Sequence, residues 1–393
     1  MIGLYVHIPF CSVKCFYCDF VAFSGQGGAA ERYVRALLRE AVLYPSLRPE
    51  TLYIGGGTPS ELTAVELDML LRGLSDRYGD LASLREATIE ASPESADASK
   101  LDVLRRGGVS RVSFGLQTTQ DRLLKEIGRK HTWADFARVY REARARGLSV
   151  NVDLMFGLPG QSQAEALESL DRILDLGPDH LSLYGLQVED RTLFAKRRVD
   201  VDDGFARDMM EASIQRLREA GFKHYEISNF ARPGKESVHN INYWLDGPYL
   251  GLGCGAAGYM DGARYQNEDR LKRYLERVED GRRPVAHQER LEGKEKLGET
   301  LMLGLRLIDG VPLTREMRTA FRGELKRLIE RGLVVQEAAE RSERPPLARL
   351  SAEGVFWANE VFRSFVPPFD DDIGDPADPR TDLPHSVLAE EKS

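Results

Sequence analysis

The chain has 393 residues, of which 42% are hydrophobic and 30% charged, so it is long enough for one large domain and a smaller one. Its 54 Lys and Arg residues against 62 Asp and Glu residues give a net charge of −8, which argues against nucleic acid or an anionic membrane as a partner. Four cysteines are too few for a disulfide scaffold. Three of them, Cys11, Cys15 and Cys18, nevertheless lie within eight positions. This cluster is the most informative feature of the composition.

The start of the chain bears on its compartment. Residues 1–10 contain no basic segment of the secretory type and lead directly into the cysteine cluster. No apolar stretch approaches the roughly 18 residues that a membrane helix needs. We therefore expect a cytoplasmic protein with reduced thiols and no integral membrane segment.

Six short β-rich runs follow one another along the first half of the chain, and helical patterns separate them. Between the first two runs, Tyr33, Val34, Leu37, Leu38, Ala41 and Val42 form one apolar face at helical spacing. Repeated strand–helix units predict an α/β fold with a parallel sheet and right-handed crossovers. The predicted strands are Gly3–Ile8, Thr51–Ile54, Ala87–Glu90, Arg111–Phe114, Ser149–Met155 and His180–Tyr184.

Such a sheet can be open and doubly wound, or it can curve into a barrel. Unusual polar and glycine residues stand at or just past the carboxyl ends of the predicted strands, which is the edge where β/α barrels build their sites. Six units favour a partial (β/α)6 barrel of the TIM type over residues 1–235. The residues at this edge are Cys11–Cys18, Gly55–Pro59, Glu90, Gln117, Asp153 and Gly157–Pro159.

The remaining chain divides into three ranges. Residues 236–290 are rich in glycine and aromatic residues, and we expect them to connect the barrel to a smaller domain. Residues 291–366 are mainly helical in pattern, with helices expected at 297–307, 325–329 and 355–365. A hairpin of 332–335 with 347–350 makes this domain resemble a winged helix. Residues 367–393 are acidic, rich in proline and predicted to be disordered.

The cysteine cluster has the spacing C-x3-C-x2-C on a loop that leaves the first strand. Three nearby thiolates suit an iron–sulfur cluster or zinc. A structural zinc site needs four closed ligands, and the only other cysteine, Cys254, is far away in the sequence and is expected to be a small buried apolar residue. A cubane held by three cysteines leaves one iron open for chemistry. The spacing therefore favours a [4Fe-4S] cluster bound by Cys11, Cys15 and Cys18, with zinc as the alternative.

This spacing, with an aromatic residue before the last cysteine, resembles the signature of radical S-adenosylmethionine proteins. Further motifs resemble the oxygen-independent coproporphyrinogen III oxidase family over nearly the whole chain to Phe365. These motifs are Tyr5–Cys11, Gly55–Pro59, Phe114–Thr118, Gly128–His131 and Asp153–Pro159.

The resemblance implies that S-adenosylmethionine binds to the open iron and that eight residues contact it. Consecutive glycines allow close approach to its amino group, carboxylates can bind hydroxyls or a cationic group, and an arginine can pair with a carboxylate. The implied residues are Tyr5, Gly56, Gly57, Thr58, Glu90, Gln117, Arg129 and Asp153.

One position divides this family. The true oxidases carry a fourth cysteine two residues after the third, where this chain has Phe20. They also have an N-terminal extension ahead of the first strand, whereas this sequence begins four residues before Tyr5, so we expect no such extension here. The chain also contains His239-Asn240-Ile241-Asn242-Tyr243-Trp244, which is similar to the H-N-x-x-Y-W motif of the haem chaperone branch.

The resemblance makes His239 the axial ligand of haem, with Tyr243 and Trp244 offering flat apolar surface to the macrocycle. The alternative is a hydrogen-bonded histidine in an aromatic turn that seals the open side of the barrel. Other candidate ligands are His7, His131, His180 and His224.

The resulting hypothesis is a haem chaperone that carries a [4Fe-4S] cluster and S-adenosylmethionine and passes haem to an acceptor protein, free or membrane-bound. An electron donor such as flavodoxin or ferredoxin is a second expected partner. The alternative hypothesis is an oxygen-independent coproporphyrinogen III oxidase or another radical enzyme, and the sequence assigns no catalytic residue. A zinc-stabilised barrel with an unrelated binding role is the third hypothesis.

Overall fold

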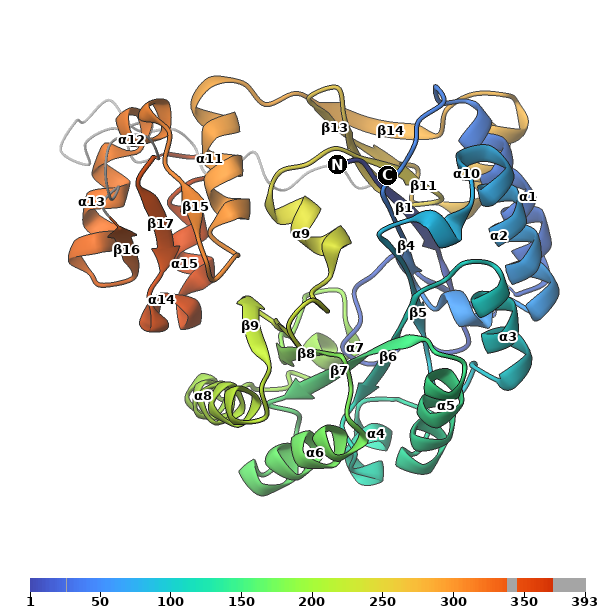
Figure 1. The fold of residues 1–393 in the computed structure, drawn as a ribbon, viewed down its shortest axis with the longest axis horizontal. Coiled ribbons are helices and arrows are strands. Elements are labelled where there is room, and N and C mark those ends of the chain that lie inside the picture. Colours follow the sequence, from blue (N-terminus) through green and yellow to red (C-terminus); the bar gives the residue numbers. More distant parts are fainter. Residues whose placement is uncertain (26, 338–344, 370–393) are drawn as a thin grey trace. The chain divides into compact units, whose positions relative to one another are not determined.

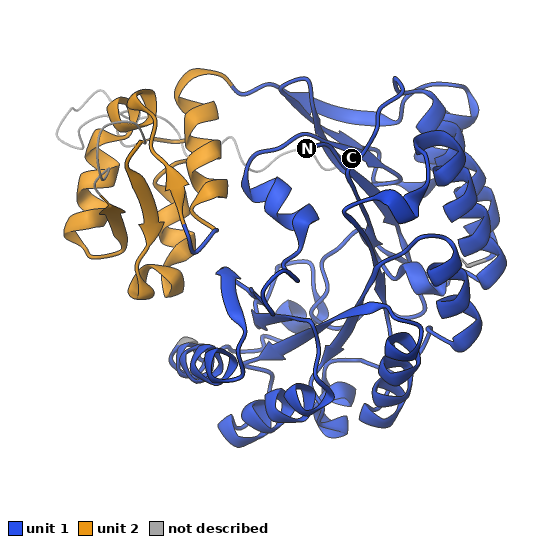
Figure 2. Ribbon diagram, viewed as in Figure 1, with its two compact units in different colours: residues 1–291, 307–309 blue, residues 292–306, 310–393 orange. Residues whose placement is uncertain are grey.

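The computed structural model describes residues 1–25, 27–337 and 345–369, and it divides into two compact units (Figure 2). The first unit contains residues 1–291 and 307–309, and the second contains residues 292–306 and the chain from 310 onward. The predicted barrel (1–235) and the predicted connecting segment (236–290) thus fall within one unit. From residue 370 onward, the predicted disordered tail lies outside the described residues.

The first unit is built on a parallel sheet whose six central strands are those that the sequence predicts. Each is paired in parallel with the next in chain order, so the predicted α/β class is confirmed. The strands are β1 (Gly3–Ile8), β4 (Thr51–Gly56), β5 (Glu86–Ala91), β6 (Arg111–Gln117), β7 (Ser149–Phe156) and β8 (His180–Gly185).

Further strands extend this sheet at both ends. Beyond β1 lie β11 (Tyr249–Leu252), which is parallel to β1, and then β12 (Ala257–Met260), β13 (Ala263–Asn267) and β14 (Val285–Glu289), each antiparallel to its neighbour. Beyond β8 lie antiparallel β10 (Asn229–Ala231) and β9 (Lys223–Glu226). Among the described residues β14 and β9 do not pair, so the sheet curves without closing. Residues 249–289 therefore prolong the sheet.

Helices cover the convex side of the curved sheet, and α9 (Val238–Trp244) lies on its concave side (Figure 1). Capping boxes begin three of the outer helices, with Thr63, Thr132 and Ser162 as the N-cap residues. Besides α9, the α-helices described in this unit are α1 (Ala30–Val42), α2 (Ala64–Tyr78), α3 (Ala98–Arg106), α4 (Asp121–Glu126), α5 (Trp133–Ala145), α6 (Gln163–Leu176), α7 (Leu193–Lys196), α8 (Asp203–Glu219) and α10 (Leu271–Glu279), of which α2, α5 and α6 begin with the capping boxes.

The second unit combines helices with a three-stranded antiparallel sheet in the order β15-β17-β16. The predicted hairpin is present as β16 (Val334–Glu337) and β17 (Leu347–Leu350), with β15 (Val311–Pro312) on the other side of β17. The helix expected at 355–365 is instead two short helices that meet at Trp357. The helices are α11 (Gly293–Gly304), α12 (Arg315–Ala320), α13 (Arg322–Glu330), α14 (Ala352–Phe356) and α15 (Ala358–Arg363).

Candidate functional site

The cysteine loop, residues 11–18, leaves the carboxyl end of β1 through the short strand β2 (Phe10–Cys11), which pairs with β3 (Phe23–Ser24). Two backbone hydrogen bonds hold the loop in place: the amide of Phe16 donates to the carbonyl of Ile127 at 3.2 Å, and the amide of Phe194 donates to the carbonyl of Phe16 at 3.0 Å. The three cysteines of the loop are free and half-buried. The loop is therefore anchored from two later segments while its thiols stay accessible.

A cavity of about 350 Å³ opens beside this loop and gathers most of the predicted site. All three cysteines line it, together with seven of the eight residues implied for S-adenosylmethionine. Tyr5 is the exception, since it is not part of the lining. Its hydroxyl lies 2.9 Å from Nδ1 of His7. The seven are Gly56, Gly57, Thr58, Glu90, Gln117, Arg129 and Asp153.

The glycine motif brings backbone close to the cysteine loop. A Cβ on Gly57 would stand 2.8 Å from the carbonyl oxygen of Phe10 and 3.0 Å from that of Ile8, both of them backbone atoms that cannot yield easily. Gly56 has a φ of 113°, which disfavours any side chain. Next to them, Oγ1 of Thr58 lies 3.4 Å from Sγ of Cys11. The glycines are therefore required for the geometry of this wall.

Two carboxylates face the cavity. Glu90 accepts hydrogen bonds from the hydroxyl of Tyr53 at 2.8 Å and from the amide of Gly56 at 3.1 Å, and burial raises its pKa to about 7. Asp153 accepts from Nδ2 of Asn151 at 2.8 Å, and burial raises its pKa as well. A positive group entering the cavity would favour the charged form of both acids. The wall therefore favours a ligand with a cationic centre and hydroxyl groups.

Arg129 supplies a largely buried positive charge to the wall of the cavity. Its Nη1 donates to Sγ of Cys15 at 3.4 Å, and its Nη2 donates to Oγ of Ser92 at 3.0 Å and to the carbonyl of Gly115. Its Nε is buried without a hydrogen-bond partner. Buried polar groups normally have partners, so this unpaired donor fits a site that takes a ligand with acceptor oxygens.

The donor set fits the groups that the sequence implies. Burial raises the pKa of Cys11 to about 11 and also raises that of Cys18, which favours the protonated thiols, and metal binding would displace these protons. In the described part of the chain, no three His, Cys, Asp or Glu side chains converge on the position of a single metal ion. A cubane spreads its cysteines over separate irons, so its ligands stand further apart than those of one ion.

Sequence reasoning did not select several other residues that line the cavity. Glu94 follows Glu90 by four positions on the loop after β5, and this proximity was the one signal that could have marked it. Phe20, singled out only as a replacement for cysteine, lines the cavity with 65% of its surface exposed. The additional lining residues include Ser92, Glu94, Ser113, Met155 and Tyr184.

His239 lies elsewhere in the barrel. It is fully buried on the concave side of the sheet, stacked on Tyr53 with 5.4 Å between ring centroids. Its Nδ1 lies 2.8 Å from Oγ1 of Thr51 and its Nε2 lies 2.7 Å from the hydroxyl of Tyr243. Burial lowers its pKa to about 3.

This position differs in level from the cysteine loop. His239 bonds to Thr51, which pairs with Gly3 at the start of β1, whereas the loop begins beyond Ile8 at the other end of that strand. Five residues of strand correspond to about 16 Å. Haem iron would need a free lone pair on a ring nitrogen of His239. Both ring nitrogens instead lie against hydroxyl groups, those of Thr51 and Tyr243. In this arrangement His239 is a buried, hydrogen-bonded histidine on α9 near the amino ends of β1 and β4, and neither Tyr243 nor Trp244 lines the cavity.

The other candidate histidines also have partners. His7 and His224 bond to backbone carbonyls, those of Val21 at 3.0 Å and Ile227 at 3.1 Å. His180 lies between Asn151 and Tyr225, and His131 between Glu94 and Leu116. His287 on β14 is exposed. Burial and hydrogen bonding thus leave no predicted histidine ready to bind iron in the described arrangement.

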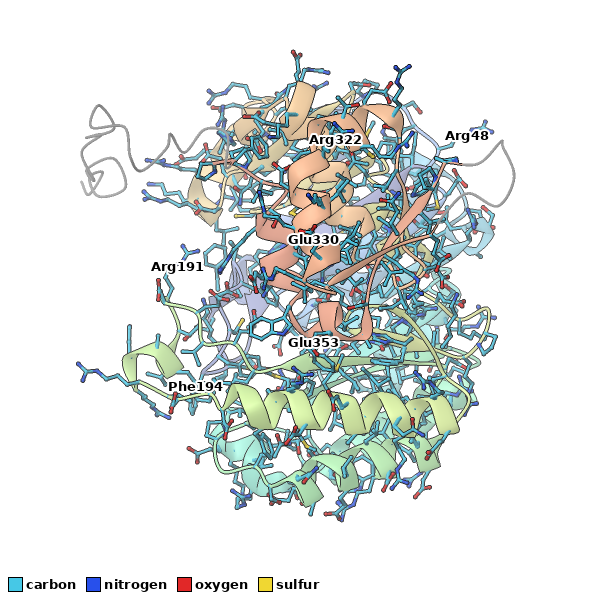
Figure 3. All side chains as sticks on the ribbon, turned by 90° about the vertical axis from the view of Figure 1, so that its left-hand side faces the viewer. Arg48, Arg191, Phe194, Arg322, Glu330 and Glu353 are labelled. Atoms are coloured by element: carbon cyan, nitrogen blue, oxygen red, sulfur yellow. The ribbon has the colours of Figure 1, made fainter. Side chains whose placement is uncertain are left out.

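A larger cavity, of about 800 Å³, belongs to the second unit and contains none of the predicted site residues. Arg322 and Glu330, at the two ends of α13, belong to its lining and are labelled in Figure 3.

Within the described residues, no helix is long and apolar enough to cross a membrane.

The fold and the cysteine-loop cavity define a radical S-adenosylmethionine domain, and the model of the Radical SAM superfamily matches residues 5–173. In the coproporphyrinogen III oxidase HemN of Escherichia coli, a radical SAM enzyme, the same fold recurs with a TM-score of 0.80 and 23% identity over 93% of this chain and 90% of that one.

Curated relatives narrow the assignment. The haem chaperone HemW of Lactococcus lactis is 35% identical over 92% of this chain and 96% of its own length, and that of Bacillus subtilis is 35% identical over 93% and 99%. HemW of Escherichia coli is 38% identical over 79% of this chain and 84% of its own. The chain belongs to the HemW haem chaperone family.

Proposed function

We propose that this protein is a haem chaperone that carries a [4Fe-4S] cluster on Cys11, Cys15 and Cys18, holds S-adenosylmethionine beside it, and delivers haem to an acceptor protein. The single observation that carries the proposal is the cavity shared by these cysteines and seven residues of the S-adenosylmethionine motif set. Kinship with HemW proteins supports the haem function. The proposal places the protein in the cytoplasm, where thiols stay reduced.

In this site the cluster would supply an open iron that can bind and reduce S-adenosylmethionine. The chain's own residues would orient that molecule. The glycine wall of Gly56 and Gly57 admits its amino group, Arg129 pairs with its carboxylate, and Glu90 and Asp153 face its hydroxyls and its positive sulfur. A reduced flavodoxin or ferredoxin is the proposed electron source.

Anaerobic reconstitution tests the cofactor part of the proposal. The wild-type chain should take up about four irons, and a Cys15→Ser chain should take up far less, because a cubane needs its three thiolates. Cys254→Ser is the matched control, since this buried thiol lies outside the cavity lining, and should leave the iron content unchanged. Zinc in place of iron would contradict the proposal.

Haem transfer tests the function itself. The reconstituted chain should bind haem, seen as a Soret band, and pass it to an apo-haemoprotein added in excess. Turnover of coproporphyrinogen with S-adenosylmethionine and a reductant would instead establish the oxidase alternative, which Phe20 at the fourth cysteine position disfavours.

The haem ligand needs its own experiment. We retain His239 as the proposed ligand only for a state in which α9 has left the barrel, because both ring nitrogens are hydrogen-bonded within it. His239→Ala should then change the Soret maximum, whereas His287→Ala, at an exposed site, should not. Identical spectra for His239→Ala and wild type would remove His239 as a ligand.

A further inference from the structure

A chain of polar contacts leads from the cysteine loop into the wall of the cavity. It starts at Cys15, whose sulfur accepts a hydrogen bond from Nη1 of Arg129. Nη2 of Arg129 donates to the hydroxyl of Ser92, and that hydroxyl donates to the carboxylate of Glu94. Glu94 in turn lies 3.0 Å from Nδ1 of His131. Five side chains thus form one continuous network that ends on a histidine.

Hydrogen-bond partners hold His131 and Glu94 in place. Nδ1 of His131 faces the carboxylate of Glu94, and Nε2 lies 3.3 Å from the carbonyl oxygen of Leu116. Both ring nitrogens thus face oxygen atoms, which fixes the orientation of the ring. Burial alone would raise the pKa of Glu94, but the bond from His131, the charge of Arg129 and the bond from Ser92 together lower it to about 2.

Glu94 thus stands between the guanidinium of Arg129 and the ring of His131. The His131 side chain is fully buried and that of Glu94 is 23% exposed, so solvent does little to replace these interactions. Without the carboxylate, Ser92 and His131 would lose a hydrogen-bond partner, and Arg129 would lose the nearby negative charge that offsets its burial. The favourable response of Arg129 would be to move its guanidinium away from Cys15 and toward solvent. The position of Arg129 thus depends on a residue that does not touch it directly.

We propose that Glu94 and His131 are a positioning pair that holds the guanidinium of Arg129 between the sulfur of Cys15 and the S-adenosylmethionine cavity. His131 fixes the rotamer of Glu94, Glu94 orients the hydroxyl of Ser92, and Ser92 fixes Nη2 of Arg129. Nη1 is then free to donate to Cys15, and the unpaired Nε remains for a ligand. The part of this inference that concerns S-adenosylmethionine rests on the proposed function; the part that concerns Cys15 does not.

The first test uses the cluster-free chain and measures alkylation of each cysteine by iodoacetamide with mass spectrometry. A neighbouring cation favours the reactive thiolate. Arg129→Gln should therefore slow the alkylation of Cys15 relative to Cys11, which bonds to Thr58 instead. Glu94→Gln should slow it as well, because Arg129 moves away.

This readout separates positioning from a simple charge effect. Loss of the negative charge of Glu94, with Arg129 still in place, would speed the reaction of Cys15. Unchanged or faster alkylation in Glu94→Gln would therefore overturn the proposal. Glu126→Gln removes a charge three positions before Arg129 from an exposed side chain and is the matched control, with a wild-type rate expected.

The second test is a double-mutant cycle on the reconstituted chain, with the dissociation constant of S-adenosylmethionine as the measurement. Glu94→Gln and Arg129→Gln should each weaken binding by about tenfold, and the double variant should be no weaker than Arg129→Gln alone. Independent, multiplying effects would show that Glu94 does not act through Arg129. A wild-type chain that binds no S-adenosylmethionine would refute the proposed function and leave the alkylation result to decide this inference.

Discussion

Replacing His239 by glutamine should flatten the dependence of folding stability on pH. The unfolded chain takes up a proton on this histidine near its ordinary pKa of 6.5, whereas burial keeps the folded form neutral down to about 3. Below pH 6.5 the unfolded state therefore binds more protons, and stability that is complete above that pH is lost as the pH falls. At about 1.4 kcal/mol per pH unit, wild type should lose about 2 kcal/mol through this residue between pH 7 and 5.

The assay is urea unfolding of wild type and His239→Gln at both pH values. Because the chain has two compact units, the probe must report the first one, and labelling of the thiol of Cys254, which is fully buried there, does so. The difference in unfolding free energy between the two chains should shrink or reverse by about 2 kcal/mol from pH 7 to 5. Equal pH slopes would refute the sealed, neutral state of His239.

Three further predictions concern the first unit. Gly57→Ala should sharply lower iron uptake on reconstitution, because its Cβ would collide with the backbone at Phe10, whereas Gly28→Ala, with no atom within 4 Å, should leave uptake unchanged. Burial raises the pKa of Glu40 to about 7 from 4.5, so this residue's contribution to stability is lost as the pH rises from 5 to 8. The difference in unfolding free energy between wild type and Glu40→Gln should therefore move against wild type from pH 5 to pH 8, and unfolding of both chains at both pH values checks this. S-adenosylhomocysteine, which lacks the positive sulfur, should bind about tenfold more weakly than S-adenosylmethionine by calorimetry, and Glu90→Gln should reduce that preference.

Helix α1 illustrates which part of the fold the sequence could predict. Its apolar spacing correctly marked Tyr33, Leu37 and Ala41 as buried. Val42, assigned to the same face, is 67% exposed, while Glu40 is fully buried. Helical periodicity predicts which face of α1 is buried over most of its length. It does not predict which residues from other elements pack against the end of the helix.

The partners of Glu40 arrive from more than 200 residues later in the chain. Its carboxylate accepts hydrogen bonds from the amide of Gly253, the amide side chain of Asn267 at 2.7 Å and the hydroxyl of Tyr274 at 2.7 Å. These residues belong to the segment that was expected to be a connection and that instead extends the sheet. A local pattern contains no information about such a contact, because the polar groups that satisfy a buried carboxylate can come from any element.

The site was predictable for a different reason. Parallel strands bring their carboxyl ends to one edge, so residues that follow several strands must gather wherever the sheet is built. This rule does not resolve position along a strand. Tyr5 lies three residues before the end of β1 and bonds to His7 outside the cavity lining, and His239 enters at the level of Gly3. Motif membership grouped these residues with the site, but their place along the strands separates them from it.

The residue two positions after the third cysteine of the loop is Phe20. The family resemblance assigns this position a cysteine in true oxidases. Here a ring that is 65% exposed stands at the cavity instead. The exchange puts an apolar ring beside the cysteine loop where the oxidases have a thiol, so any group that the thiol of an oxidase could bind or react with at this position meets only a hydrocarbon surface here. On this chemical ground the oxidase alternative is the less favoured of the two hypotheses.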